Sequence, residues 1–294
     1  MMNHLKFTLY LFTMIVGALG VNAENIKTAE FAGTFYPDGP KNLEAMIDGF
    51  FDDVDYIKSH GQIIGIIVPH AGYVYSGPVA AYAFKAIAGN TYDTVILLGA
   101  SHRYSFRGVS VYPNGFFTTP LGNFEVDSEL AQSFKHLPFV NFDTRYFNGE
   151  HSLEVELPFL KKSLKDVRIV PIIFGSLNYD ELSQLAKELA EASKIKKVLV
   201  LVSTDLSHYF KYDQANKIDE KTIKYIEDKN AFGLWVSNDL GENRACGIMP
   251  LIAFLSYASL KQADMEILKY ANSGDTASDK ERVVGYVSAI AHIK

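Results

Sequence analysis

The sequence predicts a single-domain, three-layer α/β/α fold, in which helices cover both faces of a mixed, largely parallel sheet. Apolar runs rich in β-branched residues occur at 63–68, 94–99 and 168–174, and such runs are typical of strands buried on both faces. Stretches with helical periodicity separate these runs, as parallel strands require. No linker, low-complexity tract or repeated unit divides the 294 residues, a length that one large α/β domain can fill.

The N-terminal segment predicts a secretory signal peptide at residues 1–23. Lys6 precedes an apolar stretch at 7–20, and Val21-Asn22-Ala23 fits a small-x-Ala cleavage site. We therefore expect cleavage after Ala23, export to the periplasm or the extracellular space, and a mature domain at 24–294. An uncleaved membrane anchor is the alternative, although the apolar run is short for a membrane span. Contact with the membrane is expected only through this segment, before cleavage.

The remaining elements follow from periodicity along the chain. Amphipathic or apolar stretches predict helices at 42–51, 127–135, 179–193, 214–228, 231–239 and 248–260, and strands at 197–203, 265–271 and 283–293.

Three local signals predict turns and helix ends. Ser76 and Pro78 predict the start of a helix that continues to residue 87, with serine as N-cap and proline in the first turn. Pro113-Asn114-Gly115 predicts a hairpin between apolar segments at 109–112 and 116–119. Pro158 should kink or restart the helical segment that begins near residue 150.

Charge and cysteine content exclude some classes of function. The formal net charge is -6, and no cluster of lysine or arginine is present, so a nucleic-acid partner is not expected. Cys246 is the one cysteine and cannot form an internal disulfide. It precedes a predicted helix N-terminus, which would lower its thiol pKa and favour the reactive thiolate. A buried structural thiol is the alternative.

Three histidines follow apolar strands within a few residues: His70, His102 and His208. If these strands are parallel and adjacent, the histidines converge on the sheet edge where α/β proteins bind ligands. Histidine is the commonest metal ligand and a frequent acid–base group. Asp205, three residues before His208, could orient that imidazole or bind metal, or only cap the following turn.

Glu150 and His151 open a predicted helical segment beside a glycine. They either face the same site, or His151 only packs there. The chain contains no Gly-x-Ser-x-Gly elbow, Walker loop, dinucleotide-binding glycine motif or His-Glu-x-x-His. The enzyme classes that depend on these motifs are therefore not expected.

Five short motifs occur in a fixed order and carry a family resemblance. They are Pro69-His70-Ala71-Gly72-Tyr73, Leu98-Gly99-Ala100-Ser101-His102, Glu150-His151-Ser152-Leu153-Glu154, Ser203-Thr204-Asp205-Leu206-Ser207-His208 and Cys246-Gly247. The set resembles the Memo family, whose prokaryotic members include the AmmeMemoRadiSam system protein B. That family in turn resembles the class III extradiol dioxygenases, which hold non-haem Fe(II) with two histidines and a carboxylate.

The resemblance implies a class III extradiol dioxygenase-like fold and assigns roles to residues. His70 and His102 match the histidine ligands, and Cys246 stands at the position of the third ligand. His208 matches the acid–base histidine, with Asp205 beside it. Glu150, His151 and Tyr73 are expected to surround the ligands. A thiolate in place of a carboxylate changes ligand softness and redox behaviour.

These observations give three hypotheses. The first is a metal-binding protein, with non-haem Fe(II) as the expected ion and zinc or copper as alternatives, that performs redox or dioxygenase-like chemistry on a small substrate. The second is a non-catalytic module of the same fold that binds a peptide or small molecule through aromatic residues near Tyr73 and Tyr75. The third is a metal-assisted hydrolase that activates a bound water. The position of Cys246 relative to His70 and His102 separates the metal hypotheses from the second.

Overall fold

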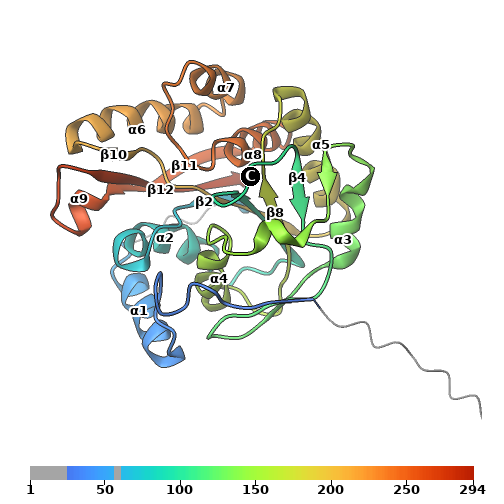
Figure 1. Cartoon of the computed structure of the whole chain (residues 1–294), viewed down its shortest axis with the longest axis horizontal. Coiled ribbons are helices and arrows are strands. Elements are labelled where there is room, and N and C mark those ends of the chain that lie inside the picture. Colours follow the sequence, from blue (N-terminus) through green and yellow to red (C-terminus); the bar gives the residue numbers. More distant parts are fainter. Residues whose placement is uncertain (1–24, 56–60) are drawn as a thin grey trace, which may run out of the picture.

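The computed structural model describes residues 25–55 and 61–294, and it places a large sheet between two layers of helices (Figure 1). Four neighbouring strands are parallel, in the order β2 (Gln62–Val68), β9 (Val198–Ser203), β3 (Thr94–Ala100) and β8 (Arg168–Phe174). Nearly every residue of these strands is buried. Burial on both faces explains why the sequence shows continuous apolar runs rather than alternation.

Antiparallel strands extend this sheet on both sides. The long β12 (Val283–Ile293) lies antiparallel to β2, and it also pairs with β11 (Asp264–Asn272) and β10 (His208–Phe210). At the other edge, β4 (Val109–Val111) pairs antiparallel with β8, and β7 (Val140–Asn141) pairs parallel with β4. The predicted mixed and largely parallel sheet is therefore confirmed.

Helices cover the two faces of the sheet as expected, and both layers are visible in Figure 1. One layer holds α1 (Pro40–Asp52), α2 (Tyr73–Ile87) and α4 (Leu157–Ser163), and the other holds α5 (Tyr179–Ile195), α6 (Tyr212–Glu227), α7 (Ala231–Asp239) and α8 (Ile248–Leu260). Short helices are α3 (Ser128–Ser133) and α9 (Ser273–Thr276), with 3-10 turns at Phe134–His136, Thr144–Phe147 and Glu154–Glu156.

The predicted hairpin between 109–112 and 116–119 is wrong. β4 joins the large sheet, whereas β5 (Phe116–Phe117) pairs with β1 (Ile26–Lys27) and β6 (Phe124–Glu125) in a separate small sheet. Gly115 has a φ of 105°, and a Cβ there would lie 1.9 Å from the Asn25 carbonyl oxygen. The glycine therefore serves the close approach of another chain segment rather than a two-stranded turn.

The predicted N-cap at Ser76 is also wrong. Helix α2 begins at Tyr73 with Gly72 as its N-cap, and the hydroxyl of Ser76, in the first turn, donates to the carbonyl of Ala71 just before the helix. Pro78 consequently lies within the helix and leaves the Val74 carbonyl without its usual donor. Val74 is exposed, so water can satisfy that carbonyl.

Pro158 marks a restart, as the sequence indicates. A 3-10 turn at Glu154–Glu156 gives way to α4, in which Pro158 occupies the first turn. The predicted signal peptide at 1–23 lies outside the described residues. Among the residues that are described, no helix combines the length and apolar character that crossing a bilayer requires.

Candidate metal centre

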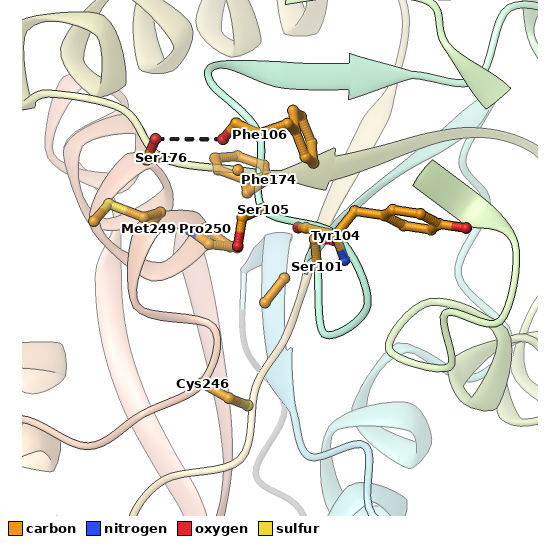
Figure 2. A pocket seen from close by; sticks show the side chains of 11 residues that line it. Ser101, Tyr104, Ser105, Phe106, Phe174, Ser176, Cys246, Met249 and Pro250 are labelled. Carbon is orange, nitrogen blue, oxygen red and sulfur yellow. Dashed lines mark hydrogen bonds between the residues drawn. The ribbon is translucent and has the colours of Figure 1, made fainter. Parts of the chain in front are cut away.

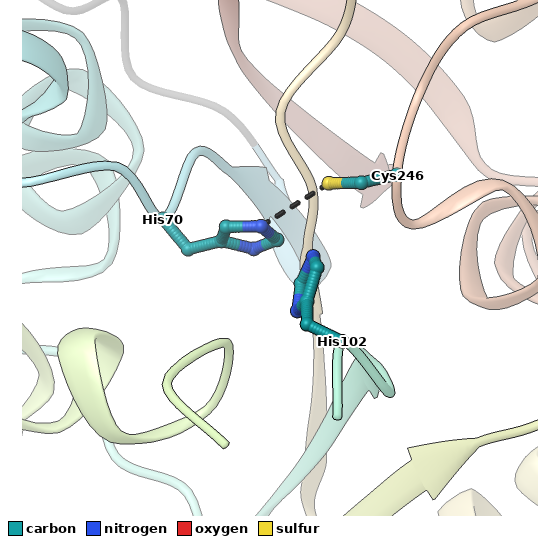
Figure 3. A group of neighbouring side chains, drawn as sticks. All are labelled: His70, His102 and Cys246. Atoms are coloured by element: carbon teal, nitrogen blue, oxygen red, sulfur yellow. Dashed lines mark hydrogen bonds between the residues drawn. The ribbon is translucent and has the colours of Figure 1, made fainter. Parts of the chain in front are cut away.

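Three side chains from distant parts of the chain converge at the carboxyl edge of the parallel strands (Figure 3). His70 follows β2, His102 follows β3, and Cys246 precedes α8. The sulfur of Cys246 lies 3.1 Å from Nε2 of His70. One candidate ligand atom from each of the three lies within 4.8 Å of the others. Cys246 therefore lies close enough to His70 and His102 for the three side chains to hold one metal ion, as the metal hypotheses require.

His70 is held from two sides by the end of β9. Its backbone N–H donates to Oδ1 of Asp205 at 2.8 Å, and its ring Nδ1 lies 2.7 Å from Oγ of Ser203. The Ser203 hydroxyl donates its single proton to the Ser152 carbonyl, so its oxygen is left to accept from Nδ1–H of His70. This assignment of the proton leaves Nε2 of His70 free to bind a metal.

The same serine connects His70 to a buried carboxyl group. Oε1 of Glu156 lies 2.9 Å from Oγ of Ser203, and Glu156 is almost fully buried. Burial raises the pKa of Glu156, which favours its neutral form. Burial, and next the neighbouring His102, lower the pKa of His70 to about 3. The imidazole of His70 is therefore neutral near pH 7, as a metal ligand must be.

Glu150 holds His102 in an equivalent way. Its Oε1 lies 2.9 Å from the ring Nδ1 of His102, and its Oε2 accepts the backbone N–H of His102. Burial opposes ionisation of Glu150, but the hydrogen bonds from His102 outweigh it and lower its pKa to about 2. A carboxylate on Nδ1–H fixes the tautomer and leaves Nε2 for a metal.

Two glycines allow these segments to approach the strand ends. A Cβ on Gly99 would lie 2.7 Å from Oγ of Ser152, in the loop that carries Glu150. A Cβ on Gly247 would lie 2.7 Å from the Ser203 carbonyl oxygen. Both positions therefore require glycine for close approach rather than for an unusual φ.

The predicted lowering of the Cys246 pKa is wrong. Helix α8 starts at Ile248, and the N–H of its N-cap, Gly247, donates to Thr204 Oγ1. Burial, and next the Asp205 carboxyl, raise the pKa of the Cys246 thiol. The backbone N–H of Asp205 at 3.3 Å from the sulfur offsets only part of this. The thiolate therefore needs a nearby cation, and a metal ion held at this place would supply one.

Asp205 and His208 are close enough to interact through charge, but they are not hydrogen-bonded to each other. Asp205 accepts the His70 backbone N–H, and within the described part of the chain no hydrogen bond joins it to His208. Burial raises the pKa of Asp205 to about 6. His208 is half-buried at the start of β10, opposite Val284, outside the group of converging ligand atoms. Its role in proton transfer stays a prediction.

His151 and Tyr73 occupy different environments. The ring centroid of His151 lies 4.5 Å from that of His102 and 5.2 Å from that of His70, and its ring nitrogen, Glu150 and His102 form a second group with metal-ligand spacing. Tyr73 is buried, donates to the Val155 carbonyl, and packs against aromatic rings of the core. Tyr73 is therefore a packing residue rather than part of a binding surface.

Sequence reasoning missed the parts played by Ser203 and Glu156. Both lie in or beside motifs that were recognised, yet neither a serine at a strand end nor a glutamate in a helical turn signals contact with a histidine. Only the pairing of β2 with β9 places Ser203 beside His70.

Comparison with known proteins identifies the family. The family model described as Memo-like protein matches residues 27–290. The chain belongs to the Memo family. A "MEMO1 family protein" of Desulfurococcus amylolyticus is 36% identical over 277 residues, covering 87% of this chain and 95% of the relative. Another, from Aquifex aeolicus, is 34% identical over 269 residues, covering 90% and 98%.

A solved structure supports the fold. An uncharacterized protein from Escherichia coli K12 superposes with a TM-score of 0.54 at 14% identity, covering 78% of this chain and all of the other. At that identity the likeness concerns the fold alone. Membership of the Memo family is consistent with the relation to class III extradiol dioxygenases that the motifs imply.

Proposed function

We propose that this Memo-family protein binds a divalent metal, Fe(II), through His70, His102 and Cys246, and uses it in redox or dioxygenase-like chemistry on a small substrate. One observation carries the proposal. Both histidines have Nδ1 engaged, by Ser203 and Glu150, and this leaves an Nε2 of each for the space beside the sulfur. In each histidine a separate hydrogen bond at Nδ1 leaves Nε2 for a metal, which is the pattern expected of metal-binding histidines.

The donor set fits a borderline transition metal. Imidazole suits iron, zinc and copper, and a thiolate adds a soft ligand. A cation would also offset the negative charge of the Cys246 thiolate and of the buried Glu150 carboxylate. Three protein ligands leave coordination positions for substrate or water. When bound, the metal would supply Lewis acidity and, as iron, one-electron chemistry.

The surrounding residues would orient ligands and move protons. Glu150 and Ser203 fix the two imidazoles, and Asp205 fixes the backbone that carries His70. We assign proton transfer to His208 on β10, which β12 separates from β2 in the sheet. Its half-buried position lets it exchange protons with solvent.

The metal identity is tested by loading. Metal-free protein would be loaded anaerobically with Fe²⁺, Zn²⁺ or Cu²⁺, and the iron form exposed to nitric oxide, an O₂ analogue that needs an open coordination position. The proposal expects retained iron and a paramagnetic nitric oxide adduct by electron spin resonance. Protein that retains zinc but not iron, and that hydrolyses esters, would instead support the metal-assisted hydrolase.

We also propose that the centre functions outside the cytoplasm, because residues 1–23 have the pattern of a signal peptide. N-terminal sequencing of the protein from culture medium or periplasm should begin at Glu24. Recovery of the uncleaved chain from the cytoplasm would contradict export.

A further inference from the structure

A cleft of about 520 Å³ opens beside Cys246 (Figure 2). Its walls come from residues 100, 101 and 104–106 at and after the end of β3, residues 174–176 at the end of β8, and the first turn of α8. This volume lies within the range of about 300–1,000 Å³ that is typical of small-molecule sites. Cys246 lines the cleft, whereas His70 is 2% exposed. A ligand in the cleft therefore reaches the candidate centre from the side of the sulfur.

The lining is uncharged. Among the described residues, the side chains around the cleft carry hydroxyl groups, apolar groups and one thiol, and none carries a carboxylate, an amine, an imidazole or a guanidinium. Ser101, Ser105 and Ser176 supply hydroxyls, while Phe174 and Pro250 supply apolar surface. Apart from a metal at the centre itself, the cleft would cost a charged ligand its hydration without supplying a counter-ion.

Arg103 and Arg107, which lie in the segment after β3, both donate hydrogen bonds to protein groups. Nε of Arg103 donates to the Gly149 carbonyl. Arg107 donates to the Ser176 carbonyl and to the carboxylate of Glu181. Neither guanidinium is among the groups that line the cleft, so neither neutralises an anion inside it.

The wall formed by the loop after β3 is fixed before any ligand binds. The Phe106 ring stacks on Tyr146 with centroids 3.9 Å apart. The Ser101 hydroxyl donates to the Tyr104 carbonyl, and the Ser176 N–H donates to the Phe106 carbonyl. A preformed wall lowers the cost of ordering on binding.

We propose that this cleft binds an uncharged small molecule that combines an apolar body with a hydroxyl or carbonyl group, and presents it to the centre at Cys246. The inference rests on the proposed function, because it names the substrate class for that centre. The hydroxyls would meet the polar group, and Phe174, Met249 and Pro250 would contact the apolar body.

Three probes that share one ring test the charge preference. Benzamide, benzoate and benzylamine are neutral, negative and positive near pH 7, and their binding to metal-free protein would be measured by titration with NMR detection. Because the lining comes from the chain alone, binding does not require the metal. Benzamide should bind at least about tenfold more tightly than either ion, a difference of about 1.4 kcal/mol.

A matched pair of variants at Ser105 tests the place of binding. Ser105 lines the cleft and is exposed, so its replacement should not disturb folding. Ser105→Trp should weaken benzamide binding at least about tenfold, whereas Ser105→Ala, which removes one hydroxyl but leaves the space open, should weaken it by no more than about threefold. Metal content of both variants should equal that of the wild type.

The outcomes separate the two proposals. Failure of benzamide to bind, equal binding of the three probes, or undiminished binding to Ser105→Trp would overturn the cleft assignment. Selective benzamide binding in a protein that never retains metal would uphold the cleft and overturn the metal centre.

Discussion

The contact between Glu150 and His102 gives the sharpest test of how the centre is held. In Glu150→Gln the side chain keeps its shape but has one acceptor oxygen and a donating amide nitrogen. The wild-type carboxylate accepts from Nδ1 of His102, from the His102 backbone and from the Ser152 backbone, using both oxygens. The variant must therefore place an N–H group against another N–H group on one side.

The expected cost follows from the loss of this holding contact. Removing a group that orients a metal-bound histidine typically lowers metal affinity about 10–100-fold, which is about 1.4–2.7 kcal/mol. Competition for Zn²⁺ against a chromophoric chelator would measure this loss. Glu129→Gln is the matched control, because Glu129 is 84% exposed and its one ion pair within the described residues is with Lys196. If Glu150→Gln folds normally and binds Zn²⁺ within about twofold of wild type, the reasoning is wrong.

Three further changes test other parts of the account. Gly247→Ala should lower Zn²⁺ affinity about tenfold by displacing Cys246. Gly49→Ala, at an exposed site in α1 with open space around it, should stabilise the fold by about 0.5–1 kcal/mol in thermal unfolding. Equal effects of the two substitutions would contradict the close approach at Gly247. Ser203→Ala should weaken Zn²⁺ binding about tenfold by freeing Nδ1 of His70, and unchanged affinity would remove Ser203 from the site. Burial opposes ionisation of Asp127, but hydrogen bonds from Thr94 and Lys196 lower its pKa below 3.8. The wild type should therefore be more stable than Asp127→Asn near neutral pH, and this difference in stability should decline as the pH falls below about 4. A difference in melting temperature that stays constant between about pH 6 and pH 3 would contradict that sign.

The sheet and the convergence of ligands could be predicted because they depend on strong local signals. The apolar runs before His70 and His102 mark buried parallel strands, and parallel strands place their carboxyl ends at one edge. The helix at 231–239 and the strand at 283–293 were also predicted with the limits that the structure shows. Both segments are mainly apolar, and Asn230 and Gly241 flank the helix.

The errors arise where long-range pairing overrides a local signal. Pro113-Asn114-Gly115 favours a hairpin, yet burial of β4 against β8 and the approach of Asn25 to Gly115 stabilise a different arrangement. The pKa of Cys246 depends on burial and on Asp205, 41 residues away in the sequence. Neither effect can be calculated from the residues next to the cysteine.

The metal content of anaerobically purified protein tests the central claim most directly. Elemental analysis of the wild type should find about one transition-metal ion per chain, and His70→Ala and Cys246→Ala should each lose it. His136→Ala is the matched control, because His136 is 59% exposed and, in the part of the chain that the structure describes, its one ion pair is with Glu188. This variant should keep the metal. A wild type without stoichiometric metal, or a content that His70→Ala and Cys246→Ala leave unchanged, would contradict the assignment of this site as a metal centre.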